Sequence, residues 1–203
     1  MWPDNKLIDK LAFSLILVVS LGLNVGLTFQ TLRLTELVRQ LKADQRLSIG
    51  QHVPPLRGTL LGQGSTTVSF DGSAETIFYL FSPKCIWCTR NLANIQVLAR
   101  NVQPSRRLIG ISLLSEGLPE YMKRNGITFP VIYEVPSDLQ MVYHLGATPQ
   151  TILVSPEGAV LRVWGGAYQG DLAREIESFF HVRLPGLSPL SAPGAILTTP
   201  KSM

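Results

Sequence analysis

Two cysteines three residues apart, Cys85 and Cys88, are the residues whose type and spacing could do chemistry. They are the only cysteines in the chain, so they are a working pair or carry no chemistry at all. On a helix, residues at i and i+3 share one face, close enough to form a disulfide. At a helix N-terminus, the partial positive charge stabilises a thiolate. The pattern therefore predicts thiol–disulfide exchange.

The neighbouring residues predict a strand and a helix that place this pair. Residues 77–81 form a short apolar run of aromatic and β-branched side chains, which is typical of a buried strand. Ser82 and Pro83 end that run. Apolar residues then recur at helical spacing, at Ile86, Leu92, Ile95, Leu98 and Ala99. Cys85 is therefore expected at the start of a helix, with Cys88 one turn later.

Two other interpretations of the pair are weaker. A zinc site needs further ligands, but there is no second cysteine pair, and His52, His144 and His181 show no ligand spacing. A purely structural disulfide over so short a loop would remove little entropy from the unfolded chain. Redox chemistry is the prediction, and it needs neither a metal nor an organic cofactor.

A membrane anchor is predicted near the N-terminus. Hydrophobic residues make up 45% of the chain, and the mean hydropathy is +0.21, which is high for a soluble domain. Residues 11–29 carry no charge, follow a short tail at 1–10, and as a helix would span roughly 29 Å. A cleaved signal peptide would have a shorter apolar core and a small-x-small site, which residues 28–33 lack.

The sequence indicates less directly on which side of the membrane the C-terminal domain lies. Basic residues flank the span on both sides: Lys6 and Lys10 before it, and Arg33, Arg39, Lys42 and Arg46 after it. Counting them favours a cytoplasmic C-terminal domain, although long domains translocate largely regardless of charge. Disulfide exchange suits an oxidising compartment, so we expect the domain on the periplasmic, extracytoplasmic side. The net charge of +4 comes with no nucleic-acid signature.

Three further segments follow the anchor. Residues 30–49 are expected to continue the helix as a stalk, with a dimer seam or a helix lying on lipid as alternatives. A globular domain is expected over residues 50–182, beginning with a stretch rich in Gly and Pro. Residues 183–203 are rich in Pro, Ser, Gly and Thr and are predicted to be a disordered tail.

The pattern within the domain alternates between strands and helices. The expected strands cover residues 66–70, 77–82, 107–114, 150–155 and 159–164, an extended piece covers 129–135, and the expected helices cover 86–99, 118–125, 137–145 and 171–180. This order predicts an α/β sandwich with a central mixed sheet.

A second motif, Thr148-Pro149, precedes the predicted strand 150–155, where a proline's missing N–H does no harm. Together with Cys-x-x-Cys at a strand–helix turn, it resembles the thioredoxin-like superfamily. The N-terminal anchor and residues 53–58, 118–145 and 155–158 narrow this to the TlpA/ResA-like membrane-anchored thiol–disulfide oxidoreductases. The resemblance covers roughly residues 50–182.

The resemblance implies a role for each matching residue. Cys85 would be the exposed nucleophile that attacks a partner's disulfide, and Cys88 the resolving thiol. Pro149 would be in the cis form and packed against the site. Thr148, Pro149 and Trp87 would contact the partner chain. The implied partners are protein thiols and disulfides.

The sequence also departs from the family. Lys84 stands where a Trp is common, Asn91 where many members have Glu, and Tyr79 where thioredoxins have a buried Asp. Another base such as Glu134 or Glu157, or water, would then have to move the proton, or the redox cycle would be slow.

Lys84 could lower the pKa of Cys85 and favour the reduced form, or it could be an ordinary solvated lysine. The direction of electron flow is therefore left open.

Two alternative functions fit the motif less well. A peroxiredoxin-like thiol peroxidase would have Thr at the position of Ser82 and a proline earlier than Pro83. A non-enzymatic redox or metal-delivery assembly module would need sulfur or histidine near the loop, and His144 is the only candidate near the proline in sequence.

Overall fold

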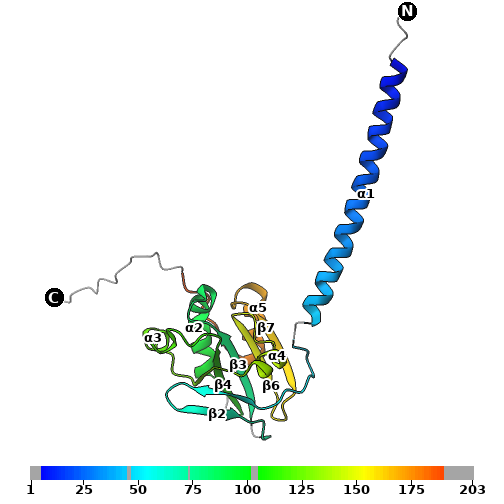
Figure 1. Ribbon diagram of the computed structural model, residues 1–203. Coiled ribbons are helices and arrows are strands. Elements are labelled where there is room, and N and C mark those ends of the chain that lie inside the picture. The colour runs from blue at the N-terminus through cyan, green and yellow to red at the C-terminus, as the bar shows by residue number, and fades with distance from the viewer. Residues whose placement is uncertain (1–5, 45–46, 73, 102–104, 190–203) are drawn as a thin grey trace, which may run out of the picture. The chain divides into compact units, whose positions relative to one another are not determined.

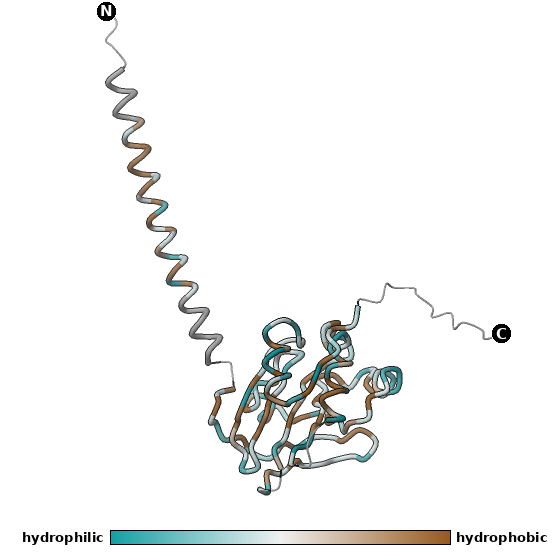
Figure 2. The backbone as a smooth tube through the Cα atoms, turned by 180° about the vertical axis from the view of Figure 1, so that it is seen from behind, coloured by the Kyte–Doolittle hydropathy of each residue, from teal (hydrophilic) through white to brown (hydrophobic). Residues whose placement is uncertain are grey.

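The computed structural model describes residues 6–44, 47–72, 74–101 and 105–189, and the chain divides into two units, Met1–Arg46 and Leu47–Met203 (Figure 1). The described part of the first unit is helix α1, Lys6–Asp44. Its stretch Phe13–Thr35 has a mean hydropathy of 1.8 with no buried residue, and Figure 2 shows its largely apolar colouring. This helix is long and apolar enough to cross a membrane.

The second unit is built on a mixed sheet. Within the described residues the sheet has seven strands in the order β2-β1-β5-β4-β3-β6-β7. The strands are β1 Leu56–Leu60, β2 Gly64–Val68, β3 Glu75–Phe81, β4 Arg106–Ser112, β5 Val131–Tyr133, β6 Gln150–Val154 and β7 Val160–Gly165. β3, β4 and β5 are parallel, and the remaining pairs are antiparallel.

Helices and loops cover both faces of this sheet, with α2 Ile86–Arg100, α3 Leu118–Arg124, α4 Ser137–Val142 and α5 Gly170–Phe180. Side chains alternate along β3, because successive strand residues point to opposite faces. Tyr79 and Phe81 pack with residues of α2, α3 and α5. Phe78 and Leu80 pack with α4 and with the segment that leads into β1. The predicted α/β sandwich is confirmed.

The position of β3 explains how distant motifs meet. β3 is an inner strand with β4 on one side and β6 on the other, and its end leads directly into α2. β6 runs antiparallel to β3, with Gln150 paired to Leu80. The residues just before β6 therefore lie at the same edge of the sheet as the start of α2.

The N-terminal hairpin differs from expectation. The Gly- and Pro-rich stretch predicted only as the start of the domain contains β1, which pairs with both β2 and β5. Its pairing with β5 is a tertiary contact: a Cβ added at Gly58 would lie 2.5 Å from Ile132 Cγ2. Local sequence gives no sign of such a partner strand.

The chain after α5 also differs from expectation. Residues 183–189, expected to be disordered, include backbone N–H groups of Gly186 and Ser188 that donate to Asn94 Oδ1 and to the Arg90 carbonyl, both at 2.9 Å. Packing against α2 fixes this part of the segment. Residues 190–203 lie outside the described residues.

Candidate active site

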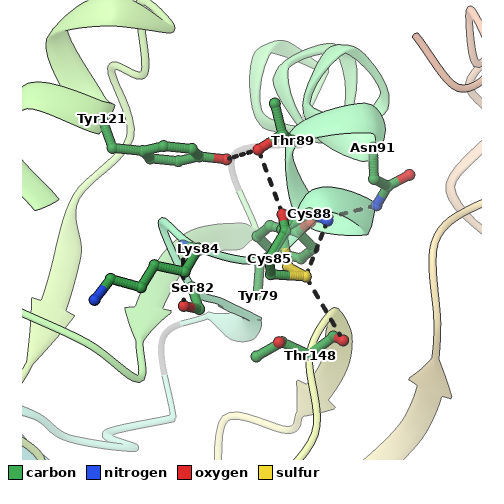
Figure 3. Close-up of a disulfide and its surroundings, with 9 residues drawn as sticks. All are labelled: Tyr79, Ser82, Lys84, Cys85, Cys88, Thr89, Asn91, Tyr121 and Thr148. Atoms are coloured by element: carbon green, nitrogen blue, oxygen red, sulfur yellow. Dashed lines mark hydrogen bonds between the residues drawn. A yellow bond between two sulfur atoms is a disulfide. The ribbon is translucent and has the colours of Figure 1, made fainter. Parts of the chain in front are cut away.

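The cysteine pair lies where the sequence predicts, at the N-terminus of α2 (Figure 3). Cys85 is the N-cap residue, with an extended backbone, and its Sγ accepts a hydrogen bond from the Cys88 N–H at 3.2 Å. The two residues form a disulfide with their Cα atoms 5.2 Å apart. Cys85 is half-buried, whereas Cys88 is only 1% exposed. Cys85 is therefore the sulfur that another molecule can reach.

A tight turn sets the position of Cys85. Its N–H donates to the Ser82 carbonyl at 3.0 Å, and the Lys84 N–H donates to Ser82 Oγ at 3.3 Å. The first turn of α2 contains no acidic residue. The partial positive charge of the helix end is therefore not offset there, and it favours a thiolate at Cys85 over a thiol.

The second motif meets the first across the edge of the sheet. The Thr148–Pro149 peptide bond is cis, as the resemblance implies, and Pro149 is buried. Cys85 Sγ lies 3.8 Å from the Thr148 carbonyl oxygen, and Figure 3 draws this contact as a dashed line. The Gly166 N–H donates to the Pro149 carbonyl at 2.8 Å and ties this loop to β7.

Lys84 is engaged away from the sulfurs. Its Nζ lies 2.5 Å from Glu116 Oε2, both side chains are mostly exposed, and the lysine extends away from the disulfide in Figure 3. The pairing with Lys84 lowers the pKa of the Glu116 carboxyl. The lysine charge is thus partly neutralised by a residue that sequence reasoning missed.

The two residues between the cysteines form an exposed apolar surface. Ile86 is 57% exposed and Trp87 is 44% exposed. Ile86, the first of the apolar residues at helical spacing, does not share the buried face of α2 with Leu92 and Ile95. It precedes Cys88 by two residues, or about 200° around the helix, so it faces away from the core. The Arg90 guanidinium lies over the Trp87 ring, 4.7 Å from its centroid.

Uncharged groups occupy the positions where the family has acids. Tyr79 is buried beneath α2, and burial raises the pKa of its hydroxyl well above the ordinary value, so the hydroxyl stays neutral. Asn91 Nδ2 donates to the Tyr79 hydroxyl at 3.5 Å. Asn91 Oδ1 accepts from Asn94 Nδ2 and from the Tyr168 N–H, both at 2.9 Å. Asn91 and Asn94 stand among buried apolar positions of α2, and that pattern could have indicated a buried polar network.

The two carboxylates proposed to move the proton, those of Glu134 and Glu157, do not lie at the cysteines. Glu134 follows β5 and accepts a hydrogen bond from Thr59 Oγ1 on β1 at 3.1 Å. Glu157 lies in the β6–β7 turn with Ser155, at the opposite end of β6 from Pro149. The structure therefore brings neither predicted candidate to the cysteines.

A stack of three aromatic rings packs next to the start of α2. Tyr79 stacks on Phe81 with ring centroids 6.0 Å apart, and Phe81 stacks on Tyr121 at 5.8 Å. The Tyr121 hydroxyl lies 3.3 Å from Thr89 Oγ1 in the first turns of α2. This contact links the first turns of α2 to Tyr121 of α3. Tyr79 and Phe81, two residues apart on one strand, were its only sequence signal.

The histidines are dispersed over the domain. His52 forms an isolated bridge with Ala159, His144 follows α4, and His181 caps α5. Among the residues that the structure describes, no three His, Cys, Asp or Glu side chains gather in a way that could hold a metal ion.

Comparison with known proteins identifies the fold of the domain. No protein-family model and no curated protein matches the sequence. Solved structures do match. The thioredoxin domain of a thiol-disulfide oxidoreductase from Bacteroides vulgatus is 18% identical, with a TM-score of 0.54 over 66% of this chain and 99% of that chain.

Two further structures agree. StoA from Bacillus subtilis is 18% identical, with a TM-score of 0.52 over 64% of this chain and 98% of that chain. A DsbF homologue from Corynebacterium diphtheriae is 18% identical, with a TM-score of 0.54 over 68% of this chain and 91% of that chain. At these identities the likeness establishes the fold. The domain has a thioredoxin-like fold, with a Cys-x-x-Cys pair at the expected helix end.

Proposed function

We propose that this protein is a membrane-anchored thiol–disulfide oxidoreductase that exchanges electrons with protein partners through Cys85 and Cys88. The observation that carries the proposal is the asymmetry of the disulfide. Cys85 is half-buried at a helix N-terminus, and Cys88 is 1% exposed behind it. An accessible sulfur at a helix N-terminus can attack, and a shielded one can resolve.

The proposed reaction has two steps. In the reducing direction the Cys85 thiolate attacks one sulfur of a partner's disulfide, forms a mixed disulfide and releases the other sulfur as a thiolate. The Cys88 thiolate then attacks the Cys85 sulfur and releases the second partner thiolate. The pair loses two electrons and the partner gains them, while the thiol protons pass to the partner through water. Oxidation of a partner is the reverse of these steps.

Groups around the sulfurs would hold the partner chain. The Thr148 carbonyl beside Cys85 is an acceptor for a backbone N–H of an extended partner segment. The exposed faces of Ile86 and Trp87 offer apolar contact next to it. The exchange uses the disulfide itself, so the proposal needs no cofactor.

The anchor would be the apolar stretch Phe13–Thr35 of α1. We propose that the domain lies on the periplasmic side, because a Cys-x-x-Cys disulfide persists most readily in an oxidising compartment. The partners would then be proteins with cysteines at or near that membrane surface.

Trapping tests the proposal. In membranes from cells that express the full chain with Cys88→Ser, Cys85 can form a mixed disulfide that nothing resolves. We expect adducts of higher mass on non-reducing gels, and reductant should release them. Cys85→Ser is the matched control, because its remaining thiol is buried. Equal adducts from both variants, or none from either, would contradict exchange through Cys85.

A peroxide assay addresses the peroxidase alternative. We expect the reduced full chain in detergent to reduce insulin disulfides and to consume hydrogen peroxide no faster than its Cys85→Ser variant. Rapid Cys85-dependent peroxide consumption without insulin reduction would favour the thiol peroxidase instead. A metal-delivery module would give neither activity and no trapped partner.

A further inference from the structure

After α5 the chain runs back along α2 toward the redox pair. We name residues 182–189 the C-terminal segment. Its Gly186 N–H donates to Asn94 Oδ1 and its Ser188 N–H donates to the Arg90 carbonyl, both at 2.9 Å. As the segment advances, its contacts move toward the N-terminus of α2. The segment therefore approaches the end of the helix that carries Cys85.

Arg90 is held by this segment at two points. Its carbonyl accepts the Ser188 N–H, and its own Nε donates to the Ser188 carbonyl at 3.0 Å. Long side chains on a helix lean toward its N-terminus, and the Arg90 guanidinium accordingly lies over the Trp87 ring, 4.7 Å from its centroid. Ser188 thus holds a cation against Trp87, one of the two residues between the cysteines.

The second contact of the segment, from the Gly186 N–H to Asn94, is linked to a buried network of hydrogen bonds. Asn94 is fully buried, and its Oδ1 accepts the Gly186 N–H while its Nδ2 donates to Asn91 Oδ1. Asn91 in turn donates to the Tyr79 hydroxyl. Without the segment, the buried Asn94 oxygen would lose this hydrogen bond, which is costly in a protein interior. The segment is therefore tightly docked on α2.

The C-terminal segment also borders the exposed surface beside Cys85. Ser188 and Pro189 line a hollow of about 470 Å³ on the outer side of α2, together with Ile86, Arg90 and Gln96. The segment, Arg90 and Ile86 thus line one hollow, and Arg90 also contacts Trp87.

We propose that the C-terminal segment is a positioning element of the redox site: through Ser188 it holds Arg90 against Trp87 and so fixes the surface on which the partner chain docks. The effect on turnover rests on the proposed function. The effect on Trp87 rests on the contacts alone. Arg90 and Ser188 act through Trp87 and take no part in the exchange itself.

The test uses the full chain in detergent and two variants that break the contact from opposite sides. Ser188→Pro removes the N–H that donates to Arg90, and Arg90→Gln removes the cation. Arg183→Gln is the control, because it removes the same charge from an exposed position on the same segment. The readouts are acrylamide quenching of Trp87 fluorescence, taken as the difference from a Trp87→Phe version of each protein, and insulin reduction resolved into kcat and KM.

We expect both variants to raise the quenching of Trp87, and to raise KM for insulin about two- to fivefold with kcat little changed, as loss of one exposed cation–π contact predicts. The control should match the parent.

Unchanged quenching in Arg90→Gln, or a loss confined to kcat, overturns the proposal. If Ser188→Pro does not fold, Arg90→Gln decides alone, because it leaves the segment's backbone intact. If the parent reduces no insulin, the proposed function fails, but the quenching still tests the segment.

Discussion

The positive charge of Lys84, next to Cys85, belongs to an exposed ion pair. Lys84 precedes the reactive cysteine, and its Nζ lies 2.5 Å from Glu116 Oε2. The pairing lowers the pKa of Glu116. The pair is therefore intact at neutral pH and is lost as the pH falls through that lowered pKa. The pair directs the lysine charge toward a carboxylate and away from the sulfur.

Replacing Glu116 by Gln should free this charge. In Glu116→Gln, Lys84 remains a cation with no carboxylate to hold it, and it can stabilise the Cys85 thiolate. We expect the pKa of the reduced Cys85 thiol to fall by on the order of a few tenths of a pH unit, because the group is exposed and water screens it. The ultraviolet absorbance of the thiolate as a function of pH measures this shift.

Glu120→Gln is the matched control, since Glu120 is an exposed acid in the first turn of the nearby helix α3. It should leave the thiol pKa where it is. If the two variants shifted the pKa equally, the effect would be one of net charge, and the specific role of the Lys84–Glu116 pair would be refuted.

Close packing between β3, β4 and β5 supports the strand that leads into the site. A Cβ placed on Gly110 of β4 would lie 2.9 Å from Val131 Cγ2, 3.0 Å from Phe129 Cε2 and 3.1 Å from Phe81 Cε1. All three neighbours are buried core side chains with little room to move. A glycine is needed there because of space, and its backbone angles are ordinary.

Gly110→Ala should therefore destabilise the domain by about 1–3 kcal/mol, the usual cost of overpacking a core. Gly146→Ala offers a matched comparison, because its added Cβ would meet no atom within 4 Å, and we expect a change within about 0.5 kcal/mol. Urea unfolding followed by tryptophan fluorescence measures both. Equal losses in the two variants would mean that the contacts around Gly110 relax freely.

The two units of the chain differ in what holds them together. The buried clusters of the domain are formed by residues from Leu47 onward. In α1, by contrast, the apolar side chains of the stretch Phe13–Thr35 are exposed. The domain thus carries its own core, whereas the apolar helix is exposed and is long and apolar enough to cross a lipid bilayer.

We accordingly predict that a fragment of residues 47–203 folds alone, remains in the supernatant after membranes are sedimented, and unfolds within about 2 °C of the full chain in detergent. The full chain should sediment with membranes and should resist extraction by high salt, because its proposed anchor is hydrophobic. Sedimentation and circular dichroism measure the two properties. A fragment that fails to fold, or a full chain that salt releases, would contradict this division.

The sequence by itself determined the strand–turn–helix unit and the cysteine pair at its junction. These are local features: apolar alternation, a proline break and an i, i+3 spacing act within one or two turns of chain. For the same reason it indicated the apolar N-terminal helix and the alternation of strands and helices that gives the α/β sandwich.

Only the tertiary structure decided what surrounds the pair. Strand order brings Thr148 to Cys85, and packing gives β1 its partner strand. The exposure of Ile86 and the pairing of Lys84 with Glu116 depend on which helix face meets the sheet and on a loop 32 residues away. The C-terminal segment is ordered by the buried oxygen of Asn94. Each of these is a contact between residues far apart in the chain, and local propensity carries no information about such contacts.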